Sequence, residues 1–290
     1  MEVITQTNLP LKLFSRGKVR DTYELPDGNL LMIATDRLSA FDSVFPEGIP
    51  YKGKILTQLS LFWFEKLSGI VENHLVSSEV PAGLPDYLKG RSLIVKRAKP
   101  IMLECVVRGY LAGSGLKDYN KTGEICSIPL PSGLQNASKF PQPIFTPSSK
   151  AEKGHDLNLS KDEAMKTVGA EVYEKVKELT LAIYSRASEY AESRGILLAD
   201  TKFEFGMYNG KIILIDEVLT PDSSRYWPKN LYKVGVNQPS FDKQFVRDYL
   251  ETTSWDKLPP APHLPSDIVA KTSEKYIQAY ELLTGKKFER

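Results

Sequence analysis

The sequence predicts a fold of the α+β class with mainly antiparallel sheets. Short extended runs separated by turn residues dominate the first 110 residues, and stretches with apolar residues at helical spacing become frequent after residue 160. The sequence contains no internal repeat. A chain of 290 residues is long enough to bury a full core and to form one large domain or two lobes.

The first part of the chain is predicted to contain short strands and one helix. The turn at 26–29, Pro-Asp-Gly-Asn, joins two of these strands, and Pro100 separates two others. Apolar residues at helical spacing predict a helix over 54–67. The predicted strands are residues 11–16, 19–25, 30–35, 92–98 and 101–110.

The middle of the chain has no clear periodicity. Residues 126–160 are rich in proline, serine and glycine, so we expect a long loop that is either functional or disordered. The capping box Ser160-Lys161-Asp162-Glu163 then begins a helix. The later predicted elements are a long helix that ends at Gly195, a helix over 241–250, a proline-rich connector over 258–265 and a last helix from Ser266.

Composition excludes several classes of protein. The formal charge of +2, from 38 basic and 36 acidic residues, argues against a protein dedicated to binding nucleic acid. Two cysteines suit a reduced cytoplasmic protein, and with three scattered histidines they predict no zinc site. The N-terminus does not resemble a leader, and no apolar run is long enough to cross a bilayer. We therefore expect a soluble cytoplasmic protein without a membrane partner.

The most informative segment is 198–206, followed by 212–217, because acids and a lysine interrupt two apolar strands. Alternation along a strand places Asp200, Lys202 and Glu204 on one face. The residues between them, Thr201, Phe203 and Phe205, face a core. Since buried charge is costly unless it is paired or binds a metal, the first face is a candidate metal site. An exposed charged hairpin is the alternative.

The turn between these strands decides where Asp216 lies. A two-residue turn at 209–210 pairs Glu204 with Ile215 and sends Asp216 to the opposite face. A three-residue loop with a bulge at Gly210 pairs Glu204 with Leu214 and brings Asp216 beside Lys202. We favour the second register, which places Glu204 and Asp216 about one ion apart and predicts a Mg²⁺ site with attached phosphates.

Two further clusters suggest anion binding. Arg16, Gly17, Lys18 and Arg20 occupy a turn between strands, where backbone N–H groups and cations can cover phosphates, although a solvated basic turn has the same pattern. With a magnesium site elsewhere, this turn suggests a two-lobed ATP enzyme. Arg108 follows Glu104 on one strand face and precedes Ser114 at a helix start, a pattern for binding phosphate or carboxylate or for a structural Glu104–Arg108 pair.

Many separated segments of the chain resemble the SAICAR synthetase family of purine biosynthesis. The likeness covers nearly the whole chain. The matching segments are 16–21, 36–42, 100–108, 112–114, 198–206, 216–217, 221–225 and 240–244. The resemblance implies a two-lobed ATP-binding fold related to ATP-grasp and kinase-like lobes, with a smaller β-rich lobe over 1–99 that covers the ATP phosphates and a larger α+β lobe over 100–290 with the metal and substrate sites.

The family reaction joins L-aspartate to the carboxylate of carboxyaminoimidazole ribonucleotide (CAIR) and forms the succinocarboxamide SAICAR, while ATP becomes ADP and phosphate. The resemblance implies an activated acyl phosphate, Mg²⁺ as cofactor and a monomer, with a dimer as the alternative. Two other functions are compatible with the residues. A small-molecule kinase would not need aspartate, and a nucleotide sensor would bind ATP without turnover.

The resemblance also assigns roles at matching positions. The implied catalytic residues are Asp200, Lys202, Glu204 and Asp216, of which Glu204 and Asp216 hold the metal. The implied ATP-binding residues are Arg16, Gly17, Lys18, Arg20, Lys96, Lys99, Met102 and Glu104. The implied substrate-binding residues are Arg108, Ser114 and Arg225 for the ribonucleotide, and Asp36, Arg37 and Ser39 for aspartate.

Overall fold

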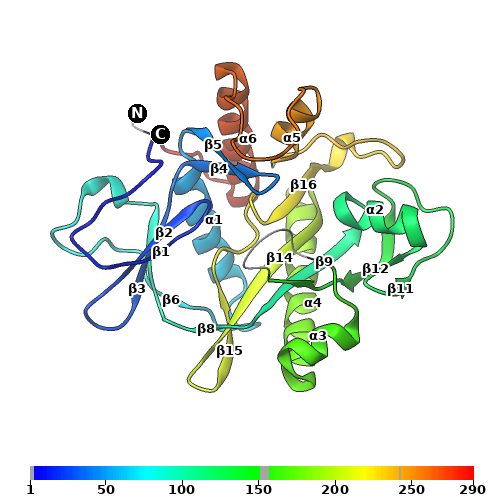
Figure 1. The fold of residues 1–290 in the computed structure, drawn as a ribbon, viewed down its shortest axis with the longest axis horizontal. Helices are drawn as coiled ribbons and strands as arrows, with labels where there is room; N and C mark the ends of the chain where they lie inside the picture. Colours follow the sequence, from blue (N-terminus) through cyan, green and yellow to red (C-terminus); the bar gives the residue numbers. More distant parts are fainter. Residues whose placement is uncertain (1–2, 151–156, 242) are drawn as a thin grey trace.

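The computed structural model describes residues 3–150, 157–241 and 243–290. Two antiparallel sheets form the body of the molecule, and helices cover them (Figure 1). The first sheet takes its strands from the first hundred residues, and the sequence predicts all of them except residues 75–77. Its order is β1 (Leu13–Arg16), β2 (Arg20–Glu24), β3 (Leu30–Ala34), β7 (Ser92–Val95) and β6 (Leu75–Ser77).

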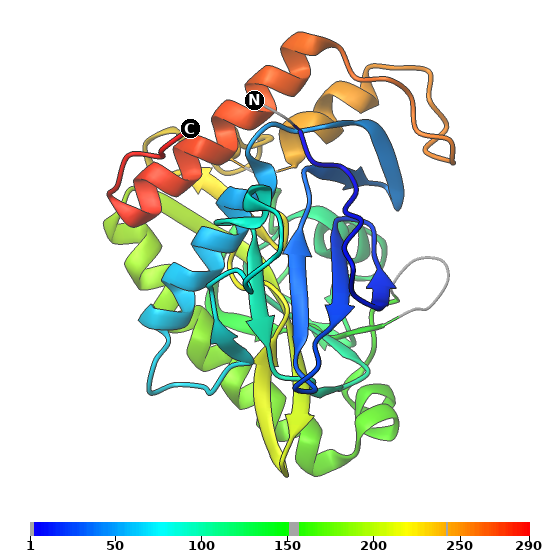
Figure 2. The ribbon, with the colours of Figure 1, turned by 90° about the vertical axis from the view of Figure 1, so that its left-hand side faces the viewer.

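The second sheet is built around β14 (Ile196–Tyr208), a strand of 13 residues. This strand pairs with four others, so it connects most of the larger sheet. Its partners are β9 (Leu103–Tyr110), β15 (Lys211–Ile215), β16 (Ser224–Pro228) and β8 (Lys99–Pro100). In Figure 2 the first sheet and the β14–β15 hairpin lie in neighbouring layers.

The prediction of a long loop over 126–160 is wrong for part of the described segment. It contains β11 (Ile128–Pro129), paired with β10 (Glu124–Ile125), and β12 (Lys139–Phe145) and β13 (Ser148–Ser149), both paired with β9. Prolines within β12 and an irregular register between Lys139 and Ile144 hide the alternation, and the edge position tolerates them. Residues 151–156 lie outside the described part.

The described helices agree with the sequence pattern. The capping box predicted at Ser160 forms, with its hydroxyl accepting from the Glu163 N–H. Residues 36–42, which match the family, contain β4 (Arg37–Ala40), which pairs with β5 (Ser43–Gly48). The helices are α1 (Lys52–Lys66), α2 (Gly113–Thr122), α3 (Lys161–Val168), α4 (Ala170–Ser193), α5 (Gln244–Glu251) and α6 (Ser266–Thr284). Within the described ranges, none is both long and apolar enough to cross a membrane.

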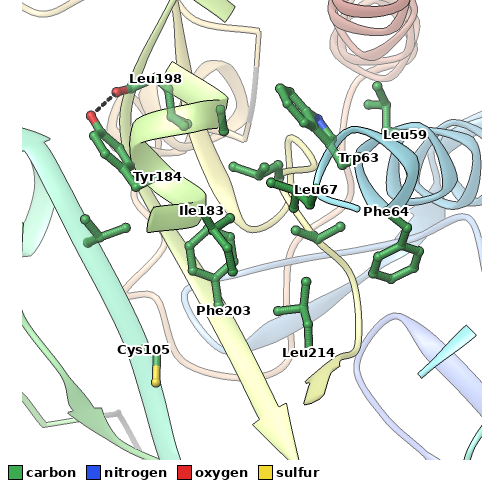
Figure 3. Close-up of a cluster of buried hydrophobic side chains, with 14 of the residues drawn as sticks. Leu59, Trp63, Phe64, Leu67, Cys105, Ile183, Tyr184, Leu198, Phe203 and Leu214 are labelled. Atoms are coloured by element: carbon green, nitrogen blue, oxygen red, sulfur yellow. Dashed lines mark hydrogen bonds between the residues drawn. The ribbon is translucent and has the colours of Figure 1, made fainter. Parts of the chain in front are cut away.

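One large buried cluster joins the two sheets to the helices (Figure 3). Helix α1 contributes Trp63, α4 contributes Ile183, and β14 contributes Phe203. The same cluster includes Leu93 and Val95 of the first sheet. Residues on both sides of the predicted boundary at 99 therefore share a core, and the division into two lobes remains a prediction.

Candidate active site

Strand β14 has one apolar, buried face and one charged face, as its alternation predicts. Phe203 and Phe205 are fully buried in the large core. Lys202 and Glu204 face the opposite way and line a cavity. The charged side chains are thus presented by a strand whose other face is fixed by apolar packing.

The favoured register of the β14–β15 hairpin is wrong. Glu204 pairs with Ile215 and Tyr208 pairs with Lys211, so the turn has two residues. Asn209 and Gly210 have φ values of 48° and 76°, the left-handed conformations that a tight hairpin of this kind requires. The local preference of Asn-Gly decides the register.

Asp216 nevertheless reaches Glu204. Strand β15 ends at Ile215, and Asp216 has a φ of 63°, so the alternation of the strand no longer sets its direction. Asp216 and Glu204 line the same two cavities. The predicted pair of acids forms through this backbone turn and not through the predicted register.

Cations surround these acids. Arg20 lies 3.0 Å from Asp216 Oδ1 and 2.9 Å from Glu217 Oε1, and Lys150 contacts Glu204 Oε2. Burial raises the pKa of Asp216 to about 7 against the attraction of Arg20, and the charge of Glu204 adds to this rise. For Glu204, burial is outweighed by Lys150 and Lys202, which lower its pKa. Arg20 and Lys150 therefore neutralise these carboxylates. A metal ion that binds the carboxylates would have to displace these cations, and an anionic ligand could bind to them.

Asp200 lies between two arginines. Arg108 donates to Asp200 Oδ2 at 2.9 Å, and Arg225 donates to the same oxygen. Arg108 also donates to the Ser114 hydroxyl at 3.0 Å. The alternative of a Glu104–Arg108 pair is wrong, since Glu104 pairs with Lys202 at 2.8 Å. These contacts leave an arginine pair and a hydroxyl close together at the start of α2.

The basic turn before β2 is held by hydrogen bonds to its backbone. The Gly17 N–H donates to the Arg20 carbonyl at 2.8 Å and closes the turn. Arg37 donates to the carbonyl oxygens of Gly17 and Lys18 at 2.9 and 3.0 Å. Arg16 pairs with Asp21 at 3.1 Å. Arg37 and Arg16 are thus engaged in the framework of the turn.

Asp36 lies in the interior. Its carboxylate accepts from the Ile4 and Gly53 N–H groups and pairs with Arg91 at 3.0 Å. Of the three residues assigned to aspartate, Ser39 lines the charged cavity, whereas Asp36 and Arg37 are absent from its lining. Their side chains are already satisfied within the protein.

Two cavities meet at Glu204 and Asp216. The first, about 510 Å³, lies between the two sheets and combines apolar side chains such as Leu30, Met32 and Val95 with the cations Lys96 and Lys99. The second, about 610 Å³, is lined by charged and hydroxyl groups that include Lys18, Arg20, Ser39, Ser114 and Lys202. Met102 belongs to neither lining and is 45% exposed. One apolar and one charged cavity share a wall of two carboxylates.

A family model described as SAICAR synthetase matches residues 13–262. The chain belongs to the SAICAR synthetase family. A phosphoribosylaminoimidazole-succinocarboxamide synthase of Thermodesulfovibrio yellowstonii is 60% identical over 290 residues, covering 98% of this chain and 99% of that protein. The enzyme of that name from Geobacter sulfurreducens is 55% identical, with the same coverage.

Solved structures of SAICAR synthetases agree with the fold. SAICAR synthase from Saccharomyces cerevisiae, complexed with SAICAR, is 47% identical with a TM-score of 0.89, covering 99% of this chain and 100% of that one. A SAICAR synthetase in complex with ADP is 28% identical with a TM-score of 0.71, covering 95% of this chain and 99% of that one. These matches confirm the predicted family, fold class and enzyme class, and they do not support the kinase alternative.

The structure adds site residues that the sequence prediction missed. Lys150 lies in the sequence segment 145–152, which resembles the longer branch of the SAICAR synthetase family, and Lys243 lies in the matching segment 240–244, but no charge pattern marked them. Glu217, next to Asp216, pairs with Arg20. Asp222 contacts Lys243 at 3.2 Å and lines the charged cavity with it. The family match was the available signal for Lys150 and Lys243, because their partners are distant in sequence.

Proposed function

We propose that this chain catalyses the ATP-dependent joining of L-aspartate to the carboxylate of CAIR, giving SAICAR, ADP and phosphate. The single observation that carries the proposal is the wall of Glu204 and Asp216 shared by an apolar and a charged cavity. This geometry suits a reaction in which a nucleotide passes its terminal phosphoryl group to a charged substrate. The relatives solved with SAICAR and with ADP support the same pair of ligands.

In this proposal the apolar cavity receives the nucleotide base. Leu30, Met32 and Val95 offer apolar surface, and Lys96 and Lys99 stand at the cavity wall. The turn with Lys18 and Arg20 lies towards the shared acids, where phosphates would extend. Backbone N–H groups and cations of such a turn suit phosphate oxygens.

The donor set fits magnesium. Among the residues that the structure describes, no group of three or more His, Cys, Asp and Glu side chains could hold a metal alone. Mg²⁺ commonly binds through one or two carboxylates, with water and substrate phosphates as the other ligands, so Glu204 and Asp216 would hold it with the nucleotide. When bound, it would neutralise negative charge on the phosphates and the CAIR carboxylate.

The protein's own groups would position the reactants. The Ser114 hydroxyl, which lines the charged cavity, would contact an anionic group of CAIR, and the guanidinium groups of Arg108 and Arg225, oriented by Asp200, would add positive charge beside it. A carboxylate is a poor electrophile, so its oxygen attacks the terminal phosphorus of ATP, ADP leaves, and the resulting acyl phosphate is attacked by the aspartate amine. The amine loses a proton and phosphate departs as the amide forms. Positioning and charge neutralisation by Lys202 and the arginines supply the catalysis.

Aspartate would bind on the charged cavity's other wall. Lys18, Lys243 and Arg247 line that cavity together with Ser39. Such cations suit the two carboxylates of L-aspartate. Asp36 and Arg37, first assigned to aspartate, would instead support the loops around this wall. The proposal thus keeps Ser39 and replaces the other two contacts.

We also propose a cytoplasmic monomer. Cys105 and Cys126 are free thiols, as suits a reducing compartment, and the monomer follows from the family resemblance. Light scattering coupled to size-exclusion chromatography tests the oligomeric state, and a mass of twice the chain would overturn the monomer.

The deciding experiment measures ADP release by the purified protein with ATP, Mg²⁺ and CAIR, with and without L-aspartate. We expect ADP and the succinocarboxamide product in equal amounts, with strict dependence on both cosubstrates. ADP release that ignores aspartate would replace the ligase with a kinase. Binding of ATP without turnover would make the protein a nucleotide sensor.

A further inference from the structure

Lys150 forms an ion pair with Glu204, a proposed ligand of the metal. Its ammonium contacts Glu204 Oε2 and lies 3.7 Å from Glu104 Oε1. The Glu204 side chain is only 18% exposed, and its other oxygen, Oε1, lies 4.0 Å from the Lys202 ammonium. A divalent ion and the Lys150 ammonium would compete for the same carboxylate.

Lys150 contributes more to neutralising the charge of Glu204 than to neutralising that of Glu104. Lys202 lies 2.8 Å from Glu104 Oε2 but 4.0 Å from Glu204 Oε1. Removing Lys150 would leave Glu104 with a close partner and would leave Glu204 with a more distant one. Lys150 is therefore the main partner of Glu204, and Lys202 is the main partner of Glu104.

Lys150 has an anchored backbone and a partly exposed side chain. It follows β13, where Ser148 pairs with Glu104 of β9 and Ser149 pairs with Leu103. The side chain is 27% exposed, and the four-carbon stem of a lysine lets the ammonium change partners without a shift of the strand. The ammonium can thus reach either the carboxylate or a ligand placed next to it.

We propose that Lys150 is a counter-ion for Glu204 that transfers to the nucleotide phosphates when metal and nucleotide bind together. The inference rests on the proposed function, which makes Glu204 a metal ligand. Metal entering alone would displace Lys150 and leave two cations side by side. Metal entering with a nucleotide gives Lys150 new anionic partners, so binding of the two ligands is coupled through this residue.

The experiment titrates the whole protein with Mn²⁺ as a probe, without nucleotide and then with saturating ADP, and follows free Mn²⁺ by electron paramagnetic resonance. For Lys150→Met we expect nucleotide-free affinity for Mn²⁺ to rise by about five-fold or more, and ADP affinity in Mn²⁺ to fall. Lys150→Arg keeps the cation and should stay close to wild type. Lys211→Met is the matched control, because Lys211 pairs with Glu72 on an exposed surface.

Unchanged nucleotide-free Mn²⁺ affinity in a folded Lys150→Met protein overturns the inference. Thermal unfolding and circular dichroism check the fold, and Lys150→Gln serves in place of a variant that does not fold. Glu204→Gln separates the two proposals. If it leaves Mn²⁺ binding unchanged with and without ADP, the metal assignment itself fails; if it weakens binding while Lys150→Met has no effect, only the role of Lys150 fails.

Discussion

At the scale of single residues, Glu204 and Asp216 concentrate negative charge where the two cavities meet. We expect Glu204→Gln and Asp216→Asn each to lower kcat by about two decades or more, as when a transition-state electrostatic contact is lost. Steady-state kinetics at saturating Mg²⁺ and substrates measures this. Glu72→Gln, on the surface, is the control. A folded active-site variant with near-wild-type turnover would contradict the assignment.

His74 predicts a pH dependence of stability. Burial, with Arg20 and Lys96 nearby, lowers its pKa to about 3 from the ordinary value of 6.5. Between these two values the unfolded chain binds a proton that the folded protein does not, so stability is lost as the pH falls through this window. Relative to His74→Gln, the wild-type free energy of unfolding should drop by roughly 1–2 kcal/mol from pH 7 to pH 5.

Urea unfolding of both proteins at several pH values measures this difference. The variant also loses the edge contact of His74 with Phe64, but that loss does not depend on pH. Parallel pH profiles for the two proteins would show that folding does not lower the pKa of His74.

Sequence analysis identified the acids but not all their partners. Alternation was enough for Lys202 and Glu204, because strand geometry is local. The direction of Asp216 depends on a left-handed residue after the strand ends, which alternation does not describe. Asp36 is paired with Arg91, and such contacts between distant segments follow from the tertiary fold alone.

At the scale of elements, Gly109 allows α4 to approach β9. A Cβ at this position would lie 1.9 Å from the Tyr184 hydroxyl oxygen, and that hydroxyl donates to the Leu198 carbonyl at 2.6 Å (Figure 3). Gly109→Ala should lower the free energy of unfolding by about 1–3 kcal/mol, because the helix or the tyrosine must shift. Denaturant unfolding measures the loss.

Tyr184→Phe tests the cause of that loss. Alone, it removes one hydrogen bond and should cost about 1 kcal/mol. In the double variant with Gly109→Ala, the clash with the hydroxyl is absent, so the total should be smaller than the sum of the single losses. Additive losses would place the strain elsewhere.

Helices and central strands were predictable because their patterns are long and regular. The caps and apolar spacing of α3, α4 and α6 predicted them, and so did the alternation in β14. Strand β12 was missed because its hydrogen bonds to β9, and not its own sequence pattern, make it a strand. The β14–β15 turn was missed because a bulge was preferred over the local conformation of Asn209-Gly210.

At the scale of the whole molecule, Asp222 joins segments far apart in the chain. Its carboxylate pairs with Lys52 of α1 at 2.7 Å and with Lys243 at 3.2 Å, and it accepts from the Tyr276 hydroxyl of α6 at 2.6 Å. Lys52 and Asp222 are almost completely buried. The two lysines lower the pKa of Asp222 despite its burial.

Removing this carboxylate leaves Lys52 buried without its partner. Asp222→Ala should therefore lower the free energy of unfolding by about 3–5 kcal/mol. The double variant Lys52→Met with Asp222→Leu removes both charges and should recover part of the loss. Urea unfolding measures both effects. A loss below about 1 kcal/mol for Asp222→Ala would show that Lys52 finds water or another acid.

The general arrangement of the molecule followed from the family resemblance, and the solved relatives support it. The packing between the earlier and later parts of the chain could not be predicted from the sequence. Helix α1 lies in the first hundred residues but packs with α4 and β14 of the later chain, as the shared core shows. Sequence order alone does not specify such packing.

The wall of Glu204 and Asp216 also has a consequence for inhibitor design. Since Glu204 and Asp216 line both the apolar and the charged cavity, a short linker could connect a flat aromatic group in one with an anionic group in the other. Once one end is bound, the other binds at a high effective concentration, which raises affinity without any new contact. Such a compound would select for proteins that have both cavities side by side, and would bind weakly to those that have the apolar cavity alone.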